Sequence, residues 1–308
     1  MNVIVTGASG FTGRNLIRYL LALPGDVPNI QGLSRSAPQI SHPRYTHIEA
    51  DLGQINRIRH ILKNISPDAI IHLAGRNNGT LTELLHSNVI NTRNLLEAVL
   101  QNGLNPRILV IGSSAEYGYA GLEPIAETAP LRPVGAYGVS KVAQDLLSIS
   151  YHYAHALNIA VARPFNIIGP VQADSFICGR LVRQTMEIQA GTREAIELNG
   201  GDTRRDFIDV RDVADAYWKL ISHDNFHSQI TGHAFNIGSG KSTSILEVIR
   251  ELSAITGITV PIIMNQSKGK ELVPEQISDI TLMHSRTGWV PSISLNHSLK
   301  NMMEQTLK

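Results

Sequence analysis

The first half of the chain alternates short apolar runs with segments that are apolar at helical spacing, and this alternation limits the fold more than any other feature. The apolar runs occupy residues 2–6, 29–34, 45–50, 68–74, 107–113 and 158–164. The segments between them, such as NLIRYLLAL and INRIRHILKNI, repeat apolar residues every three or four positions. Apolar strands that alternate with helices form parallel sheets covered on both faces. We therefore expect an α/β fold with a doubly wound parallel sheet, which binds ligands at the carboxyl ends of its strands.

A glycine-rich turn, TGASGFTG at residues 6–13, follows the first expected strand and precedes a helix. Gly7, Gly10 and Gly13 allow a tight turn, a close approach to a pyrophosphate and close contact between helix and sheet. Phe11 and Thr12 begin the helix, whose amino terminus offers unpaired N–H groups to phosphates. In this position the motif predicts a dinucleotide-binding site.

The end of the second strand indicates which dinucleotide binds. An NAD site usually carries an Asp or Glu about 20 residues after the glycines, which binds the ribose hydroxyls. Here the matching residues are Leu33, Ser34 and Arg35. A guanidinium beside a hydroxyl suits a 2′-phosphate, so NADP(H) is favoured and NAD(H) stays possible. Because such sheets bind ligands at the carboxyl ends of their strands, we expect further cofactor contacts at the ends of the third and fourth strands. These residues are Asp51, Leu52, Leu73, Ala74 and Gly75.

The second half of the chain has a looser pattern. Helices are expected near 176–190 and 211–222, with strand-like runs at 206–210 and 235–240 and a final helix. We expect residues 1–165 to form the dinucleotide-binding domain, with segments near 206–240 returning to it. Residues 166–308 would mainly form a smaller substrate-binding lobe.

Composition excludes several classes of protein. The 27 Lys and Arg nearly cancel the 26 Asp and Glu, so no nucleic-acid or membrane surface is indicated. The single cysteine, Cys178, excludes an internal disulfide framework and suits a reducing compartment. The first strand starts at about residue 2, which leaves no room for a signal peptide, and no apolar run approaches the roughly 20 residues of a membrane helix. These features predict a cytoplasmic protein. No histidine pair has a nearby carboxylate in a recognised ligand pattern, so no metal site is expected.

Residues 137–141, YGVSK, place a tyrosine and a lysine four residues apart before a helical pattern. On a helix Tyr137 and Lys141 share one face. A nearby ammonium favours the phenolate and lowers the pKa of a tyrosine from its usual value of about 10, which makes it useful as an acid or base. An exposed Tyr and Lys on an amphipathic helix would show the same spacing, so the pair alone decides nothing.

Together with other motifs, however, the pair resembles the extended short-chain dehydrogenase/reductase family, in its nucleotide-sugar branch. The motifs that carry the resemblance follow the family's order: TGASGFTG, GSSAEYG (112–118), PVGAYGVSK (133–141), ARPFNIIGP (162–170), RRDFIDVRDVADAY (204–217) and TGW (287–289). They span essentially the whole chain. The resemblance implies a Rossmann fold and an NAD(P)-dependent oxidoreductase.

The resemblance also implies roles for particular residues. Ser113, Tyr137 and Lys141 match the family's catalytic serine, its acid/base and the lysine that assists it, and Pro164 would lie beside the nicotinamide. The substrate, a nucleotide-diphosphate sugar, would contact Ser113, Ser114, Tyr137, Asn166, Arg180 and Arg205. Asn166 and Arg205 would lie at the diphosphate, although Arg205 could instead pair with a nearby Asp. Arg180 is an equally reasonable exposed helix residue.

Two proton-transfer side chains found in related enzymes are missing here, and their absence excludes some of the family's reactions. Related 4,6-dehydratases carry a glutamate two residues after the catalytic Ser or Thr. Related double epimerase–reductases carry a cysteine there and a histidine after the NxxGP motif. Here the two places hold Ala115 and Val171, which cannot move protons. The resemblance therefore implies hydride and proton exchange at one carbinol carbon only.

Three functions remain open. The favoured one is NADPH-dependent reduction of the 4-keto group of an NDP-4-keto-6-deoxy-hexose, and the motifs most resemble reductases that convert GDP-4-keto-6-deoxy-D-mannose to GDP-D-rhamnose. The alternative is an NDP-sugar 4-epimerase with bound NAD. A remote alternative is a non-catalytic NADP-sensing regulator, but such proteins lose the Tyr–Lys pair. By resemblance the chain would form a homodimer through helices at about 82–102 and 139–156.

Overall fold

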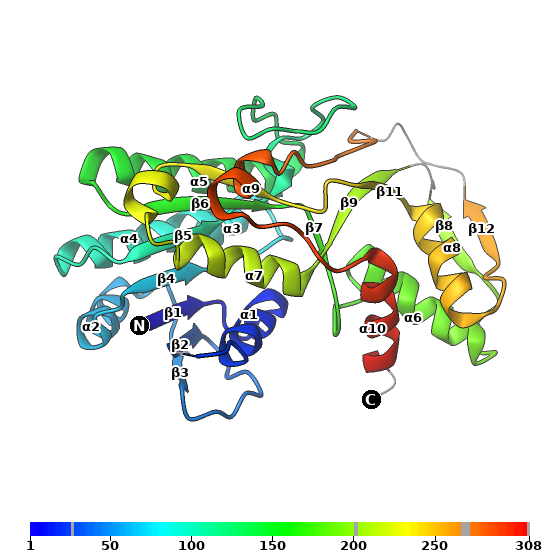
Figure 1. The fold of residues 1–308 in the computed structure, drawn as a ribbon, viewed down its shortest axis with the longest axis horizontal. Coiled ribbons are helices and arrows are strands. Elements are labelled where there is room, and N and C mark those ends of the chain that lie inside the picture. Colours follow the sequence, from blue (N-terminus) through cyan, green and yellow to red (C-terminus); the bar gives the residue numbers. More distant parts are fainter. Residues whose placement is uncertain (26–27, 200–202, 266–271, 307–308) are drawn as a thin grey trace.

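The computed structural model describes residues 1–25, 28–199, 203–265 and 272–306. Seven parallel strands form a central sheet in the order β10-β6-β5-β4-β1-β2-β3 (Figure 1). In chain order these strands are β1 (Asn2–Thr6), β2 (Asn29–Ser34), β3 (Tyr45–Glu49), β4 (Ala69–His72), β5 (Arg107–Ile111), β6 (Ile159–Pro164) and β10 (Ala234–Ile237). The order reverses between β1 and β4, as a doubly wound sheet requires. The expected fold class is confirmed.

Helices cover both faces of the sheet, because successive strand residues point to opposite sides. On β1, Val3 and Val5 join a core with helices α1 and α7, whereas Ile4 joins a core with α2, α4 and α5. The bounds are α1 (Phe11–Leu21), α2 (Ile55–Ile65), α4 (Asn91–Gln101), α5 (Gly135–His155) and α7 (Val210–Ile221). The strands in the middle of the sheet are therefore apolar on two faces, which explains their continuous apolar runs, whereas the edge strand β3 is only partly buried.

A second, smaller group of elements lies beside the sheet (Figure 1). It contains α6 (Ile177–Gln189), α8 (Ile245–Thr256), α10 (Leu295–Thr306), and strands β8 (Ile196–Asn199) and β12 (Ile262–Asn265), which pair in parallel. A separate apolar core joins α6, α8 and α10. Between the two groups, β9 (Arg204–Asp209) pairs with β7 (Asn166–Ile168) and β11 (Ser242–Ser244).

The segment near 206–240 divides between the two groups. Strand β10 pairs with β6 at the edge of the central sheet, and α7 packs against α1. Strand β9, in contrast, lies in the three-stranded sheet. The proposed domain boundary at residue 165 stays a prediction.

The remaining elements are short. They are α3 (Leu81–Leu84), a π-helix η1 (Leu85–Ile90), a 3₁₀ turn η2 (Ser114–Glu116), a π-helix η3 (Phe226–Ile230) and α9 (Thr281–Thr287). The helix expected at about 82–102 is thus present as α3, η1 and α4 in succession. Within the described residues no helix is both long and apolar enough to cross a membrane.

Candidate functional site

The glycine turn lies between β1 and α1 and brings the helix close to the sheet. Gly7 has φ +69, a conformation that side chains other than glycine rarely adopt. A Cβ on Gly13 would lie only 2.3 Å from the carbonyl oxygen of Gly7. Both positions therefore require glycine. The turn and the amino terminus of α1 form a cradle that suits a pyrophosphate.

Two hollows of about 690 and 620 Å³ meet at this turn. The larger hollow, which we call the adenosine hollow, lies at the carboxyl ends of β2, β3 and β4. Its lining includes Gly7, Gly10, Ser34, Arg35, Asp51, Leu52, Leu73, Ala74 and Gly75. The smaller hollow, which we call the reaction hollow, shares several of these residues. It adds Phe11, Thr12, Gly13, Ser113, Ser114, Tyr137, Lys141, Pro164, Asn166 and Arg205.

The structure thus brings together every residue expected in the site except Arg180. That side chain is exposed on α6 and does not line either hollow. Asn166 donates a hydrogen bond from Nδ2 to the Asp206 carbonyl at 3.3 Å. Arg205 donates from Nη1 to the Arg204 carbonyl at 2.8 Å, and it lines the reaction hollow.

Ser34 and Arg35 differ in their surroundings. Ser34 is buried, and its Oγ donates to the Ser36 carbonyl at 2.8 Å, which fixes the loop after β2. Arg35 is exposed at the mouth of the adenosine hollow. No Asp or Glu occupies the end of β2 itself. This donor set fits a phosphate better than a ribose diol.

Ser113 lies where β5 ends, and its backbone begins η2. Its N–H donates to Glu116 Oε1 at 2.7 Å, and its Oγ accepts the Ala115 N–H at 3.1 Å. Ser113 and Tyr137 both line the reaction hollow, and the serine side chain is near enough to lower the pKa of the phenol.

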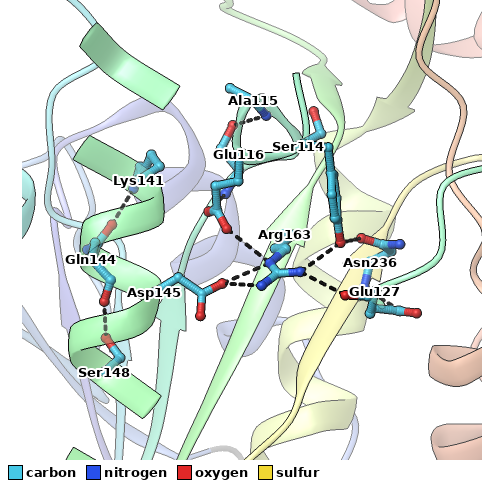
Figure 2. A network of polar contacts seen from close by, with 12 residues as sticks. Ser114, Ala115, Glu116, Glu127, Lys141, Gln144, Asp145, Ser148, Arg163 and Asn236 are labelled. Atoms are coloured by element: carbon cyan, nitrogen blue, oxygen red, sulfur yellow. Dashed lines mark hydrogen bonds and ion pairs between the residues drawn. The ribbon is translucent and has the colours of Figure 1, made fainter. Parts of the chain in front are cut away.

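Lys141 is buried on α5, one turn after Tyr137. Its Nζ donates to the Ile111 carbonyl at 2.7 Å. It also donates to Gln144 Oε1 at 2.8 Å (Figure 2). Burial lowers the pKa of Lys141 to about 8, with an opposing contribution from Glu116. The pKa of Tyr137 is raised by burial, while the hydrogen bond from Ser113 lowers it and Glu116 raises it. The expected lowering of the Tyr137 pKa by Lys141 is therefore not what sets it here.

Ala115 and Val171 are the two positions at which the family resemblance implies that proton-transfer groups are missing. Ala115 belongs to the 3₁₀ turn η2 and lines the reaction hollow. Val171 is exposed at φ +64, an unusual conformation for a branched side chain. The turn also changes the orientation of Glu116, which an extended backbone would have directed away from Ala115. Glu116 instead points inward and is fully buried.

Several residues of the reaction hollow were not named among the expected site residues. Arg76, Asn77, Gln172, Phe176 and Gln276 line it but belong to no recognised motif. Gln276 reaches η2 from the far end of the chain, donating from Nε2 to the carbonyls of Ser114 at 3.1 Å and Gly118 at 2.7 Å. Only tertiary structure brings such residues to the site. Among the described residues no cluster of three or more His, Cys, Asp or Glu could hold a metal ion.

Comparison with known proteins agrees with this geometry. A family model described as "NAD dependent epimerase/dehydratase family" matches residues 3–238. The GDP-6-deoxy-D-mannose reductase of Pseudomonas aeruginosa is 32% identical over 311 residues, which cover 98% of this chain and 95% of that protein. A UDP-glucose 4-epimerase of Azospirillum brasilense is 25% identical, covering 94% and 87% of the two chains.

Solved structures of similar fold include proteins with the same kind of activity. The structure of RMD from Pseudomonas aeruginosa complexed with NADPH superimposes with a TM-score of 0.84 and 29% identity, and all of both chains is covered. The resemblance to an oxidoreductase family that acts on nucleotide sugars is thereby confirmed. On its fold, its site and these relatives, the chain belongs to the NAD dependent epimerase/dehydratase family.

Proposed function

We propose that the protein reduces the 4-keto group of a GDP-4-keto-6-deoxy-hexose with NADPH, and that it converts GDP-4-keto-6-deoxy-D-mannose to GDP-D-rhamnose. The observation that carries the proposal is the reaction hollow itself. There Ser113, Tyr137 and Lys141 lie beside the glycine turn, and the place two residues after Ser113 holds only a methyl group.

The proposed chemistry adds one hydride and one proton to a carbonyl group. The bound nicotinamide supplies the hydride. Ser113 donates a hydrogen bond to the carbonyl oxygen and stabilises the negative charge that develops there. Tyr137 gives its phenolic proton to that oxygen, and the lysine ammonium stabilises the phenolate that remains.

The choice of cofactor and substrate is supported by separate features. Arg35 and Ser34 at the end of β2 favour a 2′-phosphate, and a relative of similar fold is complexed with NADPH. Asn166 and Arg205, on the neighbouring strands β7 and β9, would supply an amide and a cation for the diphosphate. The GDP-6-deoxy-D-mannose reductase, at 32% identity, supports a GDP sugar.

The direct test follows the loss of NADPH absorbance with GDP-4-keto-6-deoxy-D-mannose. The dTDP analogue tests the choice of base, and NADH in place of NADPH tests the choice of cofactor. We expect rapid oxidation only with NADPH and the GDP sugar. If neither sugar is reduced, the proposal is wrong. A 4-epimerase then becomes the better reading, and it is assayed by interconversion of UDP-glucose and UDP-galactose in the presence of NAD⁺.

A further inference from the structure

Two carboxyl groups are buried together behind Ser113. Glu116 comes from η2 and Asp145 from α5, and both meet the guanidinium of Arg163 in β6 (Figure 2). The exposed fractions of the three side chains are 0%, 3% and 7%. One buried guanidinium therefore lies between two buried acids.

The two acids do not share Arg163 equally. Asp145 Oδ2 accepts a hydrogen bond from Arg163 Nε at 2.8 Å and lies 2.6 Å from Nη2. Glu116 Oε2 lies 3.0 Å from the same Nε, but it accepts no hydrogen bond from any donor. The single N–H of Nε points to Asp145. Asp145 thus has a hydrogen bond from the guanidinium and a second guanidinium nitrogen at 2.6 Å. Glu116, in contrast, contacts Arg163 as an ion pair only and accepts its hydrogen bond from the backbone N–H of Ser113.

Glu116 Oε2 and Asp145 Oδ2 both lie within 3.0 Å of Arg163 Nε, which has one N–H to donate. Ionised carboxylates have acceptors only, so the two acids could hydrogen-bond to each other only with a proton on one of them. The guanidinium stabilises the negative charge on Asp145, which leaves the proton on Glu116. Burial and the nearby Asp145 raise the pKa of Glu116 well above its ordinary value, in the same direction.

We propose that Glu116 is a neutral carboxylic acid and a positioning residue for the reaction, with Oε1 holding the Ser113 N–H and the acid proton donated to Asp145. This inference rests on the proposed function. It gives Glu116 a part that does not require it to touch the substrate.

The position of Ser113 depends on this acid. Oε1 anchors the serine backbone where β5 ends, and Ser113 Oγ accepts the Ala115 N–H. With its acceptor side engaged, the hydroxyl hydrogen is available to Tyr137 or to a substrate oxygen. Loss of the anchor would let the hydroxyl drift from the place where Ser113 and Tyr137 meet.

The charge of Glu116 also affects the pKa values of the neighbouring Tyr137 and Lys141. An ionised Glu116 would raise the pKa of both Tyr137 and Lys141. A neutral Glu116 removes this effect and leaves the phenol closer to its working range. The titratable and charged groups that face Glu116 among the described residues are Tyr137, Lys141 and Asp145 from α5, Arg163 from β6, and Tyr117 directly after η2.

Three variants test the proposal in the reductase assay. Glu116→Gln preserves both interactions, because its carbonyl accepts the Ser113 N–H and its amide donates to Asp145. We expect it to rescue what Glu116→Leu loses, which is on the order of a hundredfold in kcat through misplacement of Ser113. The basic limb of the pH profile of kcat/KM should stay where it is in Glu116→Gln. Asp145→Asn, which removes the true carboxylate, should lower the melting temperature far more than Glu116→Gln.

The opposite results would overturn the proposal. If Glu116 is ionised, Glu116→Gln removes a negative charge, and the basic limb moves to lower pH. The same variant would then destabilise the fold as strongly as Asp145→Asn, since Arg163 would lose a charged partner.

A spectroscopic measurement separates this inference from the proposed function. The infrared difference spectrum of wild type minus Glu116→Gln, recorded at neutral pH without substrate, should contain the carbonyl stretch of a protonated carboxylic acid. A spectrum that shows a carboxylate band instead contradicts the inference. This readout needs no turnover, so it decides the state of Glu116 even if the protein reduces a different sugar or Glu116→Leu does not fold.

Discussion

Tyr137 and Ser113 come from different elements, and both line the reaction hollow. The hydroxyl of Ser113 is presented by the end of β5, and Tyr137 by the first turn of α5. In the proposed mechanism their chemistry depends on the nearness of the two hydroxyl groups and on the buried Lys141 one turn further along α5.

The clearest prediction at the residue scale concerns Tyr137→Phe. The variant keeps the ring but lacks the proton, so kcat should fall by a factor on the order of 10²–10⁴. Binding of NADPH, measured by fluorescence titration, should change little. Tyr153→Phe is the matched control, because Tyr153 is 76% exposed on the same helix. Turnover by Tyr137→Phe at the wild-type rate would remove Tyr137 from the mechanism.

Arg35 is the residue on which cofactor choice should depend. Arg35→Glu replaces a phosphate-binding guanidinium with an acid that repels phosphate and binds ribose hydroxyls. We expect KM for NADPH to rise by roughly tenfold to a hundredfold, with NADH becoming the better substrate. Steady-state kinetics with both cofactors measure this, with Arg59→Ala on the exposed face of α2 as control. An unchanged preference would place Arg35 outside the phosphate site.

At the scale of elements, a chain of buried hydrogen bonds joins α5 to the ends of β1 and β4. Gln144 Nε2 donates to Thr92 Oγ1 at 2.9 Å, and Thr92 donates to the Asn88 carbonyl at 2.6 Å. The hydrogen on Thr92 is thereby used, so His72 Nε2, 2.8 Å away, donates to it. His72 Nδ1 then accepts from Thr6 Oγ1 at 2.8 Å. Lys141 is therefore held through Gln144 by a network that requires neutral His72.

This network predicts a specific pH dependence of stability. Burial, with a contribution from Lys141, lowers the pKa of His72 to about 3. The unfolded state therefore binds a proton at higher pH than the folded state does, and the stabilisation present above pH 6.5 is lost as the pH falls toward 3. Relative to His72→Gln, the wild-type free energy of unfolding should decrease by about 1.4 kcal/mol per pH unit below 6.5. Denaturant titrations at several pH values measure the difference. Parallel curves for the two proteins would contradict the prediction.

The central strands were predictable because burial on two faces leaves a plain apolar signal. The expected strand at 68–74 is β4 at Ala69–His72, and that at 107–113 is β5 at Arg107–Ile111. The short strands β7, β8, β11 and β12 carry no comparable pattern, since each has only three or four residues and lies outside the central sheet. The turn η2 was missed because the capping contacts of Ser113 and Glu116 depend on the buried position of Glu116.

The site was predictable to the extent that it lies in motifs. Gly7, Ser113 and Tyr137 could be named because the family resemblance attaches a role to each. Gln276 could not, because its contact with η2 spans 162 residues of chain. Glu116 was visible in the sequence, but its burial beside Arg163 was not.

For the whole molecule we propose a homodimer that forms through α5 and the segment α3–η1–α4. Val139, Leu146 and Tyr153 are seven residues apart on α5, so they form one stripe, and they are 41%, 59% and 76% exposed. Ile90, at the end of η1, is 39% exposed. Light scattering should give a dimer mass for the wild type, and a monomer mass for the double variant Leu146→Lys and Tyr153→Lys. Val290→Lys, an exposed apolar position outside the stripe, should remain a dimer. A monomeric wild type at micromolar concentration would refute the proposal.

The late return of β10 to the central sheet has a consequence for synthesis on the ribosome. Strand β6 ends at Pro164, but its outer neighbour β10 ends at Ile237. Translation of the residues between them takes roughly 4–15 s at typical rates. During that interval β6 is an open edge with unpaired backbone groups, which other nascent chains can pair with. The period of greatest exposure to aggregation therefore falls in the second half of translation, after most of the sheet has already emerged.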